Sequence, residues 1–240
     1  MQHSAEEPKT DLAPAPMSRP APTMVRVWDL PMRVFHWGLV LATVGGLGTG
    51  CLALPRALDL HLLAGAILAA LLAFRGVWAF LGSGPSRASA LFFPPSRILA
   101  RLRGADRERY LGHNPLAGLV LAGVLAALFG LVVTGLVVLG GEEQRGPLRA
   151  WLSWDTGDGA KAVHAALSWA LLAGIGAHLA GLIHEGRSRQ EAVARAMITG
   201  LRAAELRGFR CIGEEIVGAH RQPFGQADER PQSRVGVATI

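Results

Sequence analysis

Four of the eight histidines lie inside long apolar stretches of the chain, where ionisable side chains are rare. They are His36, His61, His164 and His178. An ionisable residue in such a stretch indicates a functional site, although a single histidine also serves as a hydrogen bond between helices. Imidazole nitrogen is the commonest protein ligand of metals. The relative placement of these four side chains therefore decides whether they form a cofactor site.

Four apolar stretches without acidic residues in their interiors dominate the sequence. They cover residues 34–54, 58–81, 116–139 and 160–183. At about 1.5 Å per helical residue, each can cross a hydrocarbon layer of about 30 Å. Since backbone groups in lipid must be hydrogen-bonded internally, we expect helices. Half of the residues are hydrophobic and only 18% are charged, which argues against an ordinary soluble enzyme. The sequence predicts an all-α integral membrane four-helix bundle.

The basic residues are distributed unevenly between the two ends of these stretches. Nineteen of the 24 Lys and Arg residues lie in residues 1–33, 82–115 and the segment after 183, whereas four lie on the opposite side. The positive-inside rule then places both termini in the cytoplasm of a multi-pass protein in a bacterial inner membrane. This placement explains the net charge of +6 without nucleic acid as a partner.

The four histidines fall at two levels in this predicted topology. His61 and His164 lie near the outer ends of their helices, and His36 and His178 lie near the inner ends. His164 and His178 are 14 residues apart, which is about 21 Å along a helix and within about 40° of four full turns, so both face one side. The spacing predicts two bis-histidine sites, His61 with His164 and His36 with His178.

Haem explains two such pairs better than a bare metal ion does. Two imidazoles without carboxylate or thiolate neighbours seldom complete a zinc or iron shell. A haem supplies four nitrogens and needs only two axial ligands, and two histidines close the iron to other ligands and favour electron transfer. We therefore expect two haem b groups, with electrons passing between an outer and an inner haem. The cofactor would carry the chemistry, without covalent catalysis by a protein group.

Several other residues near these levels leave two interpretations open. Arg75 could pair with a propionate of the inner haem or extend to the cytoplasmic surface. The glycines near the histidines could admit a macrocycle or allow helix–helix contact, as in Gly46-x-x-x-Gly50. His113 belongs to a turn and helix start, and it also lies near the inner side, where we place the quinone chemistry. His184 is about 200° around the helix from His164 and is a poor ligand.

The remaining segments complete the predicted domain organisation. Residues 1–23 are polar and Pro-rich, which predicts a disordered N-terminus, and residues 24–204 form the membrane domain. Within that domain, Ser96–Gly104 predicts a basic amphipathic helix at the membrane interface. A capping box at Ser188–Glu191 predicts a second cytoplasmic helix that continues to about residue 206. Residues 205–240 form a cytoplasmic tail without a clear period.

At these residues the sequence resembles the prokaryotic cytochrome b561 family, which includes the cytochrome b subunits of nickel–iron hydrogenases. The resemblance covers about residues 26–202. Short motifs in the right order carry it, namely Arg26–Pro31 (RVWDLP), Phe35–Trp37 (FHW), His61, Arg75–Trp78 (RGVW), Gly112–Pro115 (GHNP), the His164/His178 pair and Arg195–Gly200 (RAMITG). The family's haem ligand positions match His36, His61, His164 and His178.

The resemblance implies a di-haem b-type cytochrome that moves electrons between a redox partner and the quinone pool of a respiratory chain. The partner would be a hydrogenase-like subunit or a periplasmic cytochrome, and oligomer formation stays open. Two alternatives also stay open. One is a non-redox membrane anchor or scaffold whose histidines bridge helices, and the other is a one-haem anchor subunit of a larger complex. A spectrum and a haem-to-protein ratio separate all three.

Overall fold

Four long helices form the body of the molecule. The computed structural model describes residues 23–51, 56–82, 86–106, 108–110, 112–189, 193–204 and 209–210. The long helices are α1 (Leu30–Cys51), α2 (Ala57–Leu81), α4 (Pro115–Gly141) and α5 (Trp154–Arg189). All four are long and apolar enough to cross a membrane. The prediction of a four-helix membrane bundle is confirmed, although the predicted end of the first span, at residue 54, lies outside the described residues.

Two of these helices are capped at their N-termini by a side chain that accepts a hydrogen bond from a free backbone N–H group of the first turn. The Asn114 side chain accepts a hydrogen bond from the Ala117 N–H at 2.9 Å, and Pro115 occupies the first helical position of α4. The helix start that the sequence predicts after His113 is therefore confirmed. At the start of α1, the Asp29 carboxylate accepts a hydrogen bond from the Met32 N–H at 2.8 Å.

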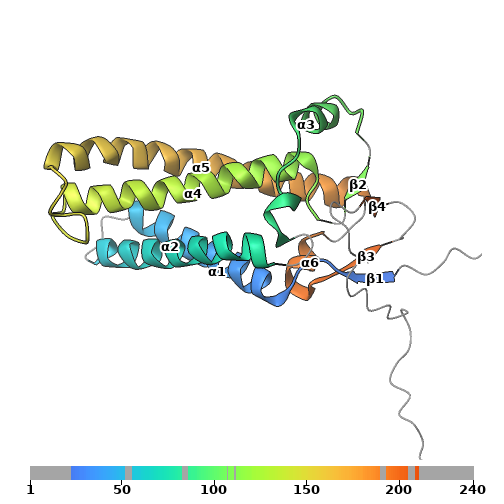
Figure 1. Ribbon diagram of the computed structural model, residues 1–240, viewed down its shortest axis with the longest axis horizontal. Helices are drawn as coiled ribbons and strands as arrows, with labels where there is room; N and C mark the ends of the chain where they lie inside the picture. The colour runs from blue at the N-terminus through green and yellow to red at the C-terminus, as the bar shows by residue number, and fades with distance from the viewer. Residues whose placement is uncertain are drawn as a thin grey trace, which may run out of the picture.

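The long helices pack as two antiparallel hairpins that lie along each other (Figure 1). One hairpin is α1 with α2, and the other is α4 with α5. Leu128 of α4 and Leu171 of α5 are fully buried in the core between the hairpins, where Leu68 of α2 is also buried. Most other apolar side chains of these helices are exposed, as expected of helices that face lipid.

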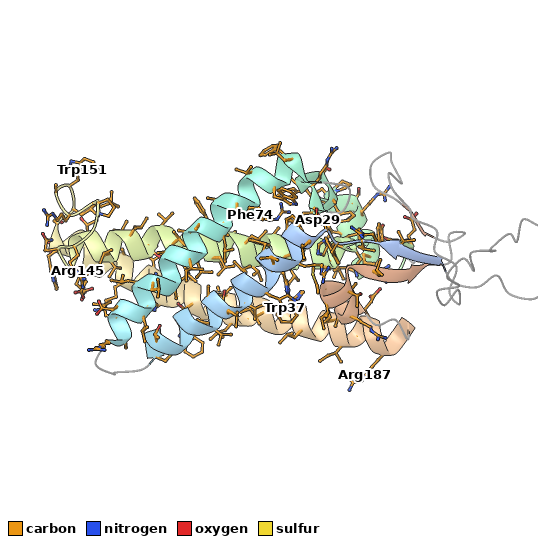
Figure 2. All side chains as sticks on the ribbon, turned by 90° about the horizontal axis from the view of Figure 1, so that it is seen from below. Asp29, Trp37, Phe74, Arg145, Trp151 and Arg187 are labelled. Atoms are coloured by element: carbon orange, nitrogen blue, oxygen red, sulfur yellow. The ribbon has the colours of Figure 1, made fainter. Side chains whose placement is uncertain are left out.

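The two ends of the bundle differ, and we name them by their structure. The strand end carries β1 (Thr23–Arg26) and β3 (Leu201–Ala204), and the loop end carries residues 142–153 between α4 and α5. Figure 2 shows Asp29 near the strand end, with Arg145 and Trp151 at the loop end. The loop end closes tightly, because a Cβ on Gly141 would lie 2.6 Å from the Ser153 carbonyl oxygen. The two helices therefore approach each other through backbone there.

At the strand end, the chain after α5 folds back on the segment before α1. Strand β1 pairs with β3 in an antiparallel ladder, and α6 (Val193–Thr199) packs beside the start of α1. Two side chains of α1 hold α6 in place. The Arg33 guanidinium donates to the Ile198 carbonyl, and the Trp37 indole N–H donates to the Met197 carbonyl at 3.3 Å.

The predicted helix from Ser188 to about residue 206 is wrong in its bounds. Helix α5 continues through Arg189, and residues 190–192 lie outside the described residues. Helix α6 then ends at Thr199, because Gly200 takes a left-handed φ of 78°. The Gly200 carbonyl accepts a hydrogen bond from the Val27 N–H at 2.9 Å. The chain thus changes from helix to strand at this glycine.

Short elements on the same side complete the fold. The amphipathic helix expected at Ser96–Gly104 is observed as α3 (Pro95–Leu102), after a 3-10 turn η2 at Ala88–Ala90. Strand β2 (Arg109–Tyr110) pairs in parallel with β4 (Phe209–Arg210). These two small sheets were not expected from an all-α sequence pattern. Of the predicted termini, residues 1–22 and most of 205–240 lie outside the described residues.

Candidate functional site

The structure brings His61 of α2 and His164 of α5 together near the loop end. Their ring centroids are 6.0 Å apart, and the ring planes make an angle of 67°. Two imidazoles that bind one metal atom from opposite sides, with bonds of about 2 Å, have centroids about 6 Å apart. Both side chains are only partly buried. The spacing of this pair therefore fits two axial ligands of one metal atom.

The second ring nitrogen of His61 has a backbone partner on α1. His61 Nδ1 lies 2.9 Å from the Gly46 carbonyl oxygen. A carbonyl only accepts hydrogen bonds, so Nδ1 carries the proton and the Nε2 lone pair is available to a metal. The Thr49 hydroxyl lies farther from Nδ1, at 3.4 Å, and donates to the Gly45 carbonyl at 2.7 Å.

The second ring nitrogen of His164 has a side-chain partner on α4. His164 Nδ1 lies 2.9 Å from Thr134 Oγ1, and this hydroxyl donates its proton to the Gly130 carbonyl at 2.8 Å. Since the only proton of the hydroxyl is used in that bond, the imidazole donates and Nε2 is again free. Hydrogen bonds of this kind orient metal-binding histidines and raise their basicity.

Glycines near this pair lie either against a neighbouring helix or against an imidazole ring. Gly46 of α1 lies against Ala64 of α2, where a Cβ on the glycine would be 3.9 Å from the Ala64 methyl carbon, so it supports helix contact. In contrast, a Cβ on Gly50 or Gly135 would lie 3.4 Å from a ring carbon of His61 or His164, respectively. These two glycines therefore leave room at the imidazoles.

The second predicted pair, His36 of α1 and His178 of α5, lies toward the strand end. The two side chains are close enough to interact electrostatically. Arg75 of α2 and His113, which precedes α4, belong to the same cluster, since His113 interacts electrostatically with His178, Arg75 and His36. The structure thus brings together residues from all four long segments of the bundle.

Three buried nitrogens of this cluster have no hydrogen-bond partner among the described residues. They are His36 Nδ1, Arg75 Nη1 and His113 Nδ1. A buried polar atom without a partner costs roughly 1–3 kcal/mol, so native proteins rarely leave several of them together. The cluster therefore has spare hydrogen-bonding capacity for a polar or anionic group.

Comparison with known proteins identifies the family of the chain. The model of the family described as prokaryotic cytochrome b561 matches residues 27–200. The chain belongs to the prokaryotic cytochrome b561 family. It is thus a b-type membrane cytochrome that functions in electron transfer, and its family cofactor is haem b.

A curated relative supports the same assignment. This chain is 25% identical over 213 residues to a protein of Bradyrhizobium diazoefficiens, with 74% of this chain and 85% of the relative covered. The relative is named "Probable Ni/Fe-hydrogenase B-type cytochrome subunit". The resemblance that the sequence motifs indicated is therefore confirmed.

The residues present fit the cofactor of a b561-family cytochrome. Within the described part of the chain, no group of three or more His, Cys, Asp or Glu side chains could hold a bare metal ion. Haem iron needs only two protein ligands, since the macrocycle supplies the other four. The His61/His164 pair has a fitting separation and two free Nε2 atoms. The partly buried guanidinium of Arg75, whose Nη1 has no partner among the described residues, suits a propionate. When bound, haem supplies one-electron transfer.

His113 is the functional candidate that the sequence characterised least. Its ring packs on Trp28 with centroids 5.0 Å apart. Burial, followed by repulsion from His178, Arg75 and His36, lowers the pKa of His113 to about 4. The imidazole is therefore neutral at neutral pH and can donate or accept a hydrogen bond. In the sequence, the signals that pointed to His113 were its position directly before the Asn114 cap and its level in the membrane, which is that of His36.

Asp29 connects the elements that carry the strand-end cluster of the cytochrome. Its second carboxylate oxygen accepts hydrogen bonds from the Trp78 indole and the Ser86 hydroxyl, both at 3.2 Å. Because Asp29 also caps α1, it fixes the start of α1 against the end of α2. His36 and Arg75 lie on these two helix segments. Asp29 is part of the RVWDLP motif, but the motif does not reveal its hydrogen-bond partners, which lie 49 and 57 positions away in the sequence.

His184 stands apart from both pairs, as its helical phase predicted. It is exposed on α5 and lies next to Ala180, Ile183 and Arg187 along the same helix surface. Figure 2 places Arg187 near the strand end of α5, with its side chain directed away from the other long helices. His184 therefore has no place in the two candidate cofactor sites.

Proposed function

We propose that this chain is a di-haem electron relay of a bacterial inner membrane. One haem b would be held by His61 and His164 and the other by His36 and His178. The observation that carries the proposal is the His61/His164 pair, whose ring centroids lie 6.0 Å apart and whose Nδ1 atoms have partners at 2.9 Å. Bis-histidine ligation favours electron transfer over oxygen chemistry.

The strand end faces the cytoplasm in this proposal, and the loop end faces the periplasm. The asymmetry of Lys and Arg supports this orientation, since 19 of the 24 lie in residues 1–33, 82–115 and the segment after 183, and the described parts of these segments lie at the strand end. The His61/His164 haem would then be the outer one. At that level it could exchange electrons with a periplasmic partner, such as a hydrogenase-like subunit of the kind named for the relative or a periplasmic cytochrome.

The quinone pool would connect to the strand-end cluster. A quinone needs hydrogen-bonding groups near a haem and a proton route to water. Three buried nitrogens, on His36, Arg75 and His113, offer such bonds to a quinone or a haem propionate. His113 is neutral at neutral pH because its pKa is about 4, so its ring can donate or accept a hydrogen bond to such a group. Reduction of the purified cytochrome by a quinol, with loss of that activity in His113→Gln, is the expected result.

The haem-to-protein ratio of the purified protein, with a reduced-minus-oxidised spectrum, tests the proposal. A ratio near two supports the di-haem relay. A ratio near one favours a one-haem anchor subunit, and a ratio of zero supports a non-redox scaffold and overturns both cytochrome alternatives. Crosslinking from the loop end to a hydrogenase-like subunit tests the partner, and crosslinking only from the strand end would contradict the proposed orientation.

A further inference from the structure

Thr134 provides the only side-chain partner that the described residues offer to His164 Nδ1. The distance from Thr134 Oγ1 to Nδ1 is 2.9 Å, and the same oxygen lies 2.8 Å from the Gly130 carbonyl. The two bonds form a short chain from the imidazole through the hydroxyl to the backbone of α4. We propose that Thr134 is a positioning residue that sets the reduction potential of the loop-end haem through His164. This inference rests on the proposed function.

The direction of the effect follows from the direction of the hydrogen bonds. His164 Nδ1–H donates to Thr134 Oγ1, whose own proton goes to the Gly130 carbonyl. Polarisation along such a chain strengthens each bond. Donation from Nδ1–H increases the electron density at Nε2, so the imidazole becomes a stronger ligand and stabilises oxidised iron. The hydroxyl therefore lowers the reduction potential, and its removal raises it.

His61, the other histidine of the loop-end pair, also has a threonine nearby and therefore provides an internal comparison. Thr49 of α1 donates to the Gly45 carbonyl at 2.7 Å, as Thr134 donates to Gly130 on α4. However, Thr49 Oγ1 is 3.4 Å from His61 Nδ1, which has the Gly46 carbonyl at 2.9 Å instead. Loss of the Thr49 hydroxyl thus removes the same bond within the helix but leaves the imidazole its main acceptor. Thr49→Val is the matched control for Thr134→Val.

The experiment is a redox titration of the purified, haem-loaded protein. We expect Thr134→Val to make reduction of one haem three- to tenfold more favourable, a positive shift of about 28–59 mV at 59 mV per decade for one electron. Thr134→Ser should restore the wild-type potential because it keeps the hydroxyl. Thr49→Val should shift the potential by less than half as much. The same variants in a His178→Ala background identify the haem that shifts.

The possible results separate this inference from the proposed function. Suppose that both variants keep a normal haem content. If Thr134→Val then leaves the reduction potential unchanged, or shifts it only as much as Thr49→Val does, the role of Thr134 is overturned while the proposed function stands. The same conclusion follows if Thr134→Ser does not restore the potential or if the shifted haem is the one lost in His178→Ala. If Thr134→Val loses haem, Thr134→Ala tests the hydroxyl without a branched side chain, by the same criterion. A wild-type protein without haem overturns both proposals.

Discussion

The two ends of the bundle hold their histidines in different ways. At the loop end, each Nδ1 has a partner at 2.9 Å from a neighbouring helix, either the Gly46 carbonyl or the Thr134 hydroxyl. At the strand end, Nδ1 of His36 and of His113 and Nη1 of Arg75 have none among the described residues. The loop-end site is thus organised by the protein alone, whereas the strand-end site has polar atoms left for other groups.

This difference would suit the two tasks of the electron relay that we propose. A site that only passes electrons needs fixed ligands, which hydrogen bonds between helices provide. A site that also exchanges electrons with a small molecule needs donors that the protein does not use itself. The hydrogen bonds of Trp78 and Ser86 to Asp29, and the bond from Trp37 to α6, hold the elements of the strand end together.

The largest expected effect concerns the neutral His113 of the strand end. Its pKa is about 4 in the folded protein and about 6.5 when unfolded. The unfolded chain binds the proton more readily, so this histidine stabilises the fold above pH 6.5 and destabilises it as the pH falls from 6.5 to 4. The change is about 3 kcal/mol. Denaturant titrations between pH 4 and 7 should show this loss in the free energy of unfolding of the wild type but not of His113→Gln. The same pH dependence in both proteins would show that His113 is not buried as a neutral group.

Replacement of Arg75 should affect one haem and leave the other in place. A hydrogen bond to a charged group contributes about 1.5–3 kcal/mol, so Arg75→Leu should weaken retention of the strand-end haem roughly 10- to 100-fold. Arg75→Lys keeps the charge and should lose less. The rate at which each variant loses haem, on dilution or to an excess of apomyoglobin, measures this retention. Equal weakening of both haems would contradict the separation of the two ends.

Asp29→Asn should have a smaller effect, confined to the strand end. Asparagine also caps helices, so the Met32 bond is kept, but the bonds from Trp78 and Ser86 lose their charged acceptor. We expect a loss of about 1 kcal/mol in the free energy of unfolding. Hydrogen exchange should rise at the start of α1 and the end of α2. A matching rise around residues 142–153 would show that Asp29 does not act locally.

The smallest effect is expected from the surface ion pair of the loop end. Asp59 and Arg145 lie 3.9 Å apart and are both well exposed. Exposed pairs contribute about 0–1 kcal/mol. Asp59→Asn should therefore change the free energy of unfolding by less than about 0.5 kcal/mol and leave both haem potentials unchanged. A clear shift of the loop-end potential would show that surface charge, as well as the imidazole hydrogen bonds, sets it.

The pairing of the histidines could be predicted from the sequence because it depends on helical period and span order. His164 and His178 are related by four turns of one helix, and the hairpin order puts His61 and His36 at the matching levels. The acceptors of the Nδ1 atoms could not be predicted, since Thr134 and Gly46 reach the rings across helix interfaces whose rotation the sequence does not specify.

The strand end was harder to predict for a related reason. Strands β1 and β3 lie at the same end of the bundle but come from distant parts of the sequence, before α1 and after α6, and each has four residues. Neither segment has a strand pattern of its own, because its ladder partner is more than 170 residues away. The capping box at Ser188–Glu191 predicted a helix, but the turn at Gly200 and the hydrogen bond from the Val27 N–H to its carbonyl redirected the chain. There, pairing between segments that are distant in the sequence determines the structure, and the local helix signal does not.

Haem counting in the single histidine variants tests the two-site arrangement most directly. His164→Ala and His178→Ala should each lower the haem-to-protein ratio from about two to about one, and redox titration should show that each variant keeps the potential that the other has lost. Retention of both haems in either variant, or loss of the same haem in both, would contradict the assignment of one site to each end of the bundle.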